Sequence, residues 1–375
     1  MVPLARHCRV VDSSSVSLAP KGNEVTLQEA IEAVRPGDRE AQARAQARLD
    51  RLTKPVGSLG RLEELAARYV SITGTIPPPM PRAAIYTFAA DHGIAGEGVS
   101  AYPSAVTPQM VLNFLRGGAA VNVLARHVGA EVRVVDIGVA YDFGPMPGLI
   151  GRKIAAGTKN FSVEPAMSRA EAERALLVGV ELAAQAAQEG IGLIGTGDMG
   201  IGNTTSSAAI TAAVTGTQVA VVTGRGTGID DEGYRRKVAV IEQALARHRP
   251  NPHDPLDLLA KVGGFEIAGL AGLIIGAAGH RIPVVLDGFI SGAAALVAAA
   301  LQPLCREYML ASHLSVEQGH QAVLRHLDLN PLLDLDLRLG EGTGACLGIS
   351  LVQGSLKILT EMATFDEAGV SERER

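Results

Sequence analysis

Three glycines spaced as in a dinucleotide-binding turn are the first feature of this sequence that suggests chemistry. Gly195, Gly197 and Gly200 form the pattern Gly-x-Gly-x-x-Gly after the apolar run 191–194, which is the context such a turn requires. The turn also needs an acidic residue at the end of the next strand, where it binds a ribose hydroxyl. We expect that strand over 219–222, and no carboxylate follows it directly. A NAD-dependent oxidoreductase is therefore disfavoured but stays open as an alternative.

The residues directly after these glycines favour a single phosphate group. Gly202, Asn203, Thr204 and Thr205, followed by two serines, precede an Ala-rich run over 208–214 that is typical of a helix. A helix N-terminus offers free N–H groups to an anion, and amide and hydroxyl side chains cap it or add donors. We therefore predict a binding site for a mononucleotide phosphate, with a tight structural turn as the alternative.

One carboxylate between glycines is a candidate for acid–base chemistry. Glu341 lies between Gly340 and Gly342, just before an apolar helix that we expect over 345–363. Glycine lets a ligand approach the backbone, and burial would raise the pKa of the carboxyl toward the range useful for proton transfer. A glutamate that only complements the helix dipole fits the pattern equally well.

Two further stretches have the character of a binding site. Asp91 and His92 could form an acid–base pair, although an aspartate that only holds a histidine in place fits these residues at least as well. The segment 100–110 has the Pro and Ser content of a loop. It could line an apolar pocket with Tyr102, Gln109 and Met110, or serve only as the entry to a helix.

The elements that must position these residues follow an alternating pattern. Short apolar runs separated by helical patterns predict an α/β fold: a doubly wound, mostly parallel sheet with helices on both faces. The expected strands are 84–89, 132–135, 191–194, 219–222, 284–286 and 308–311. Ligands bind beyond the carboxyl ends of such strands. Polar residues follow each run there: His92, Asp136, Asp198, Arg225, Asp287 and His313.

The two ends of the chain differ from this middle part. We expect a flexible extension over 1–25, a helical part over 26–80, the α/β domain over 81–315 and C-terminal helices over 316–375. Capping boxes at Thr26 and Ser168 mark helix starts. The last segment is expected to form helical turns over 316–327 and 331–337, and its helices to join the N-terminal ones in a small subdomain.

Composition excludes several classes of protein. A net charge of −5 gives no bulk attraction to nucleic acid or to an anionic membrane, and the three cysteines contain no Cys-x-x-Cys pair. No histidine has another histidine four residues away, so we expect no metal site. The longest apolar runs are too short to span a bilayer. These features predict a cytoplasmic protein.

Seven stretches, taken together and in this order, resemble the nicotinate-nucleotide:dimethylbenzimidazole phosphoribosyltransferases of the cobalamin lower-ligand pathway. The resemblance covers about residues 50 to 360 and is more specific than any single glycine pattern. The stretches are TKPVGSLGRLEELA, FAADHGIAGEGVSAYPSAVTPQMVLNFLRGGAAVNVLAR, DIGVA, GTGDMGIGNTTSSAA, GRGTG, PVVLDGFISGAAAL and LRLGEGTGA.

The resemblance implies a reaction and a role for several residues. The family moves phosphoribose from nicotinate mononucleotide to 5,6-dimethylbenzimidazole, which yields α-ribazole 5′-phosphate and nicotinate by direct displacement with inversion at C1′. By position Glu341 matches its general base, the 200–205 turn its phosphate loop, and Lys237 a basic residue that reaches across a homodimer interface. Gln109 and Leu339 match its base pocket. No cofactor and no metal are implied.

Two departures from the family pattern stand out. Asp198 replaces the usual glutamate, which shortens the acid by one methylene, and Leu337 replaces a common methionine beside the base pocket. A non-catalytic nucleotide-binding module is a second alternative, because it would explain the phosphate loop although not a buried Glu341.

Overall fold

The structure is a computed structural model that describes residues 25–371. The extension expected over 1–25 therefore lies outside the described residues, except for Val25. Within the described part, no helix combines the length and the apolar character needed to cross a membrane.

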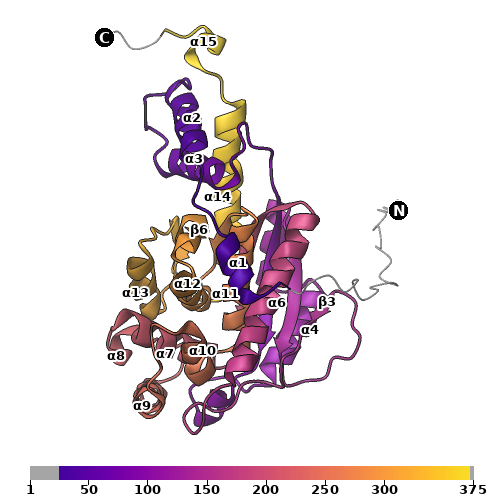
Figure 1. The fold of residues 1–375 in the computed structure, drawn as a ribbon, viewed down its shortest axis with the longest axis vertical. Helices are drawn as coiled ribbons and strands as arrows, with labels where there is room; N and C mark the ends of the chain where they lie inside the picture. The colour runs from indigo at the N-terminus through magenta and orange to yellow at the C-terminus, as the bar shows by residue number, and fades with distance from the viewer. Residues whose placement is uncertain (1–24, 372–375) are drawn as a thin grey trace, which may run out of the picture.

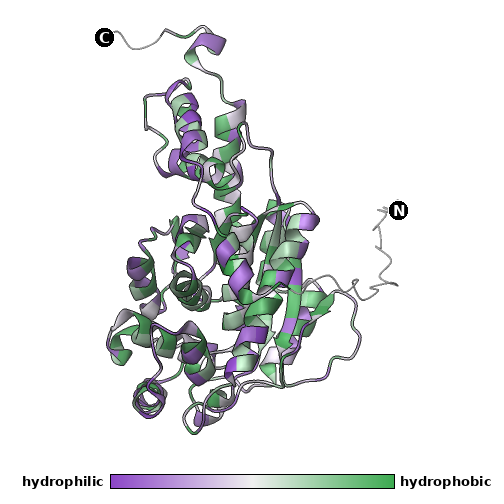
Figure 2. Ribbon diagram, viewed as in Figure 1, coloured by the Kyte–Doolittle hydropathy of each residue, from purple (hydrophilic) through white to green (hydrophobic). Residues whose placement is uncertain are grey.

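A six-stranded parallel sheet forms the centre of the molecule (Figure 1). Its strand order is β3-β2-β1-β4-β5-β6. The strands are β1 (Arg82–Ala90), β2 (Glu131–Gly138), β3 (Leu149–Gly151), β4 (Ile191–Met199), β5 (Val284–Leu286) and β6 (Met309–Ala311). They are largely hydrophobic in Figure 2, as expected of strands that are covered on both faces. The predicted α/β class is confirmed.

Helices cover both faces of this sheet, and β1 shows how. Its side chains alternate, so Tyr86 and Phe88 lie in one core with helices α6 (Arg169–Gln188), α11 (Phe265–Gly279) and α12 (Phe289–Leu301). Ile85 and Ala89 lie in a second core on the opposite face. That second core is built with α4 (Val106–Leu115), α5 (Ala120–Val128) and α14 (Thr343–Glu361).

Glycines allow the closest helix contact on the first face. A Cβ on Gly179 of α6 would overlap the backbone of α11, and one on Gly272 of α11 would overlap the backbone of α6. The high glycine content of the chain therefore has a packing role here.

Helices α2 (Arg39–Asp50) and α3 (Arg61–Thr73) lie beyond one end of the sheet, beside the end of α14 (Figure 1), and α3 also joins the second core through Leu65 and Tyr69. Leu49, Val70 and Leu359 share a small core of their own. Helix α1 (Leu27–Ala33), which we grouped with this subdomain, packs instead in the large core beside the sheet. The exact domain limits stay a prediction.

Two expected elements are wrong. Residues 219–222 form a short helix, α8 (Val219–Val222), and β4 pairs directly with β5. Periodicity cannot separate a four-residue strand from a buried helical turn. The helical turn expected over 331–337 is extended instead, and β8 (Leu333–Asp334) pairs in parallel with β7 (His313–Leu314).

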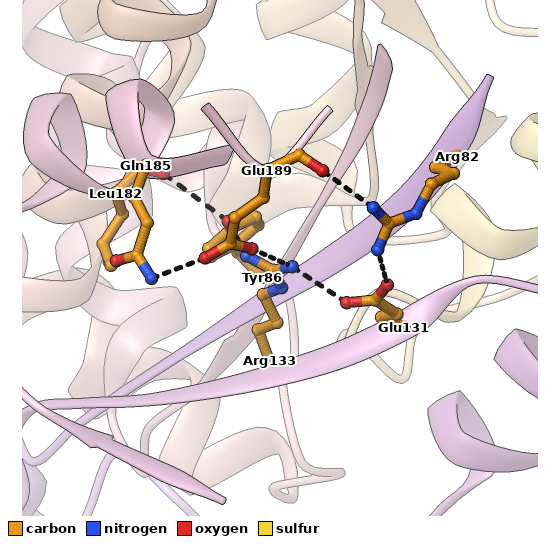
Figure 3. Close-up of polar contacts among 7 residues, drawn as sticks. All are labelled: Arg82, Tyr86, Glu131, Arg133, Leu182, Gln185 and Glu189. Carbon is orange, nitrogen blue, oxygen red and sulfur yellow. Dashed lines mark hydrogen bonds and ion pairs between the residues drawn. The ribbon is translucent and has the colours of Figure 1, made fainter. Parts of the chain in front are cut away.

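Ion pairs join residues at the amino-terminal ends of the strands (Figure 3). Arg82 and Arg133 both pair with Glu131, at 2.6 and 2.8 Å, and Arg133 also pairs with Glu189 at 2.6 Å. The opposite, carboxyl-terminal edge carries the polar residues discussed below. The remaining helices are η1 (Gly93–Glu97), α7 (Asn203–Thr215), α9 (Asp231–His248), α10 (Pro255–Val262), η2 (Pro303–Tyr308), α13 (Gln318–Leu327) and α15 (Phe365–Ala368).

Candidate active site

A cavity of about 410 Å³ opens at the carboxyl ends of the strands. One part of its wall is apolar, with Val106, Met110, Ile201, Phe289 and Ile290. The predicted site residues that line it are Tyr102, Asp198, Gly200, Gly202, Asn203, Thr204, Leu339 and Glu341. Residues more than a hundred positions apart in the sequence therefore meet in one cavity.

The Gly-x-Gly-x-x-Gly pattern at residues 195–200 does not form a dinucleotide-binding turn. Gly195 and Gly197 lie inside β4, and only Gly200 belongs to the turn that follows the strand. A Cβ on Gly197 would overlap the backbone of Glu341. This glycine is thus required by the approach of the Glu341 turn, not by a pyrophosphate.

The turn between β4 and α7 has the geometry of an anion site. Helix α7 begins at Asn203, Gly202 adopts a left-handed φ of 97°, and no side chain in the described chain caps this helix end. The expected caps are therefore wrong: Asn203 instead donates from Nδ2 to Asp198 Oδ2 at 2.9 Å. Asn203 N and Thr205 N donate to Gly200 O and Gly202 O within the turn, at 3.2 and 3.0 Å. The helix dipole makes this end suited to an anion.

Lys237 lies behind this turn, in the same chain. Its Nζ donates to Thr204 Oγ1 at 2.7 Å and to Gly224 O at 3.3 Å. The side chain is fully buried, and burial lowers its pKa to about 8. The resemblance implied a lysine that acts across a dimer interface, whereas here α9 brings it to the turn of its own chain.

Glu341 is held in an unusual backbone conformation above β4. Its φ is 66°, which costs a non-glycine residue energy and must be held by its surroundings. The surroundings are two hydrogen bonds: Glu341 N donates to Asp198 O at 3.2 Å, and Thr87 Oγ1 donates to Glu341 O at 2.9 Å. Burial raises the pKa of the carboxyl, and Val121 N donates weakly to it at 3.4 Å. The carboxyl group therefore favours taking up a proton.

Asp198 is a second buried carboxyl group in the same wall. Its Oδ1 has no hydrogen-bond partner among residues 25–371. Burial raises its pKa well above the usual range, and the nearby Asp287 and Glu266 raise it further. Two buried acids with raised pKa values in one cavity are typical of a catalytic site.

Asp287, Gln109 and Thr205 are not where we expected them. Asp287 lies beneath the Glu341 turn and accepts the N–H groups at 342, 344 and 345, at 3.2, 2.6 and 3.1 Å. It therefore caps α14 rather than lining the cavity, and burial raises its pKa to about 7. Gln109 is exposed on α4, because one residue along a helix turns the side chain by about 100°, and its neighbour Met110 lines the cavity instead. Thr205 is buried within α7.

The lining residues that were not predicted include Glu317, Ser315 and Arg338. His313, one of the polar residues expected beyond the strand 308–311, also lines the cavity. Glu317 is buried and its Oε1 accepts a hydrogen bond from Gly226 N at 2.9 Å. Burial lowers the pKa of His313. The polar residues after the strand 308–311 were a signal for His313, but no local pattern marks Glu317.

A family model described as a phosphoribosyltransferase matches residues 34–370. The chain belongs to this family. Curated phosphoribosyltransferase relatives named nicotinate-nucleotide--dimethylbenzimidazole phosphoribosyltransferase include one from Geobacter sulfurreducens, 61% identical over 346 residues, which are 92% of this chain and 98% of the relative. Another, from Chloroflexus aurantiacus, is 61% identical over 347 residues, 92% of this chain and 99% of the relative.

A solved phosphoribosyltransferase structure has the same fold. The crystal structure of CobT from Thermus thermophilus is 50% identical, with a TM-score of 0.86, and the match covers 89% of this chain and 100% of that one. The resemblance seen in the seven sequence stretches is confirmed, and the chain is an enzyme of the nicotinate-nucleotide–dimethylbenzimidazole phosphoribosyltransferase family.

Proposed function

We propose that the chain transfers 5-phosphoribose from nicotinate mononucleotide to 5,6-dimethylbenzimidazole, yielding α-ribazole 5′-phosphate and nicotinate. The observation that carries this proposal is the pairing of two features in one cavity. An uncapped helix N-terminus at Asn203 suits a phosphate, and the buried Glu341 carboxyl suits proton transfer. Family membership supports the same substrates, because the relatives above bear the name of this reaction.

The 5′-phosphate binds at the N-terminus of α7. The backbone around Gly200 and Gly202 supplies N–H groups, and the Lys237 ammonium lies behind Thr204, 2.7 Å from its hydroxyl oxygen. Bound phosphate would favour the charged form of Lys237 and offset the effect of burial on its pKa. The ribose then extends toward Asp198.

The benzimidazole lies against the apolar wall. Val106 and Met110 line this wall, and Tyr102 and Leu339 stand at its more exposed side. A flat apolar base is recognised by such a surface mainly through burial of its area. Glu341 lies at the end of the wall, where a ring N–H would meet it.

The reaction is a direct displacement at C1′. One azole nitrogen attacks C1′ while the bond from C1′ to the pyridinium nitrogen breaks, and its electron pair stays on nicotinate. Nicotinate leaves with a neutral ring nitrogen and needs little acid assistance. The proton on the other azole nitrogen passes to Glu341, and attack from the face opposite the leaving group inverts β to α.

Asp198 is a positioning residue in this proposal. It is one methylene shorter than the family's usual glutamate, and its Oδ2 is already bonded to Asn203. The free Oδ1 is directed to a ribose hydroxyl or to the azole N–H. Its role as the second acid is therefore to orient the reactants while Glu341 accepts the proton.

Product analysis with nicotinate mononucleotide and dimethylbenzimidazole tests this function. We expect nicotinate and α-ribazole 5′-phosphate in equal amounts. Reduction of NAD with no such product would support the oxidoreductase alternative. Binding of the nucleotide with no turnover would support the non-catalytic module. A homodimer, which rests on the family resemblance, and a cytoplasmic location, which rests on the composition, are part of the proposal.

A further inference from the structure

A buried histidine–glutamate pair lies beneath the phosphate loop, here defined as residues 200–205. His92, at the end of β1, and Glu266, in the first turn of α11, have completely buried side chains. Their Nε2 and Oε1 atoms are 2.6 Å apart. Asp91, which the sequence suggested as the partner of His92, instead accepts a hydrogen bond from Ala140 N at 2.8 Å. The reaction proposed above makes no use of this pair.

The hydrogen bonds around His92 define its protons. Ser206 Oγ donates its single proton to Gly263 O at 3.2 Å. His92 Nδ1 lies 3.1 Å from the same oxygen and must therefore be the donor to it. Through these hydrogen bonds His92 links the segment after β1 to the first turns of α7 and α11.

The His92 side chain also lies close to two glycines of the loop. A Cβ on Gly200 would lie 3.4 Å from His92 Cδ2, and one on Gly202 would lie 3.3 Å from His92 Cβ. Both glycines line the cavity, whereas His92 does not. His92 therefore lies behind the loop backbone that lines the cavity.

We propose that His92, held by Glu266 and Ser206, is a positioning residue that fixes the phosphate loop in its anion-binding shape. The inference rests on the proposed function, because it assumes that the loop binds the 5′-phosphate. Two hydrogen bonds at opposite ends of one planar ring fix the orientation of His92, whose Cδ2 lies beside Gly200 and whose Cβ lies beside Gly202. Loss of either bond lets the loop relax and weakens the binding of phosphate.

The test compares nicotinate mononucleotide with the same nucleoside lacking its 5′-phosphate. Calorimetry on each variant gives the ratio of the two affinities, which isolates the contribution of the phosphate. Glu266→Met keeps the bulk and removes the partner of Nε2, so we expect this ratio to fall by about tenfold, the factor that corresponds to roughly one lost hydrogen bond. Ser206→Ala should lower the ratio in the same direction.

Two comparisons separate positioning from general loss of stability. Glu266→Gln can still donate a hydrogen bond to Nε2 and should recover most of the ratio. Tyr308→Phe removes a partly buried hydrogen bond, 2.7 Å long, from Tyr308 Oη to Arg35 O, next to the amino-terminal end of β6 and outside the cavity lining. It should leave the ratio unchanged.

The inference is overturned if both Glu266→Met and Ser206→Ala leave the ratio at its wild-type value, or if they weaken both ligands by the same factor. Should Glu266→Met not fold, Ser206→Ala decides alone, since it removes only one small buried group. Product formation by the wild-type protein is measured separately. Its absence would contradict the proposed function, while the affinity ratio still tests the role of His92.

Discussion

Glu341 combines a left-handed backbone, burial and a raised pKa at the end of an apolar wall. The strained conformation persists because β4 and Thr87 hold the turn at the backbone of Glu341. Lys237 is a second residue with a shifted pKa. Burial destabilises its charged ammonium group and so lowers this pKa. The azole N–H of the base supplies a proton that Glu341 can take up. The phosphate of the nucleotide supplies an anion that stabilises the charged form of Lys237.

At the residue scale, we predict a pH dependence that belongs to Lys237. The free enzyme holds this lysine with a pKa of about 8, so the ammonium is present below that pH and is lost above it. Wild-type kcat/KM for nicotinate mononucleotide should therefore fall as pH rises through about 8. Lys237→Met should lower kcat/KM by roughly 10- to 100-fold, the loss expected of a charged hydrogen bond, and should lack this alkaline limb. A variant with an unchanged alkaline limb would show that another group titrates there.

At the scale of elements, β4 and the Glu341 turn form one unit. The strand contains glycine where the turn approaches it, and Asp287 caps the helix that the turn leads into. This arrangement explains why the glycine spacing resembles that of a dinucleotide-binding motif. Both need glycine where another group comes close to the chain, and here that group is the backbone of Glu341 and not a bound pyrophosphate.

Gly197→Ala tests this interpretation. The added Cβ would overlap the carbonyl of Glu341, so the turn must move, and we expect kcat to fall by about 100-fold, as for a displacement on the order of 1 Å at a catalytic group. Gly151→Ala is the matched control, because Gly151 lies at the end of β3 with open space around its Cβ position. Steady-state kinetics on both variants would contradict the account if the two behaved alike.

At the scale of the whole molecule, the sequence predicted the sheet better than the connections around it. The runs at 84–89, 191–194 and 284–286 are strands as expected, since short apolar runs that alternate with helical patterns predict parallel strands joined by helices. The strand expected over 219–222 is wrong, because four apolar residues fit a buried helical turn as well as a strand.

The candidate site was predictable to a similar extent. Asp198, Asn203 and Glu341 stand out through their glycine neighbours, and the cavity brings them together. The roles of Asp287 and Glu317 could not be predicted from the sequence. The first looks like any other acid at a strand end but caps a helix, and the second becomes part of the cavity only through a tertiary contact with Gly226.

The exposed apolar side chains near the cavity support the predicted homodimer. Val316 is bonded through its backbone to Leu337, and Val316, Leu335 and Leu339 are each 45% to 57% exposed in this region. Burying such side chains is favourable, and an isologous contact would do so on both subunits. We predict a dimer in sedimentation velocity runs at micromolar concentration. A fully active monomer would contradict this prediction.

The central claim, that Glu341 accepts the azole proton, is tested most directly by single-turnover kinetics of two matched variants. Positioned proton transfer contributes about 10² to 10⁴ in rate, so Glu341→Gln, which keeps the shape and removes the basicity, should slow the chemical step on that order with little change in nucleotide affinity. Asp198→Asn makes the equivalent change in the neighbouring acid and should slow the step much less. If Asp198→Asn loses far more of the chemical step while Glu341→Gln stays near wild type, the assignment of the base is wrong.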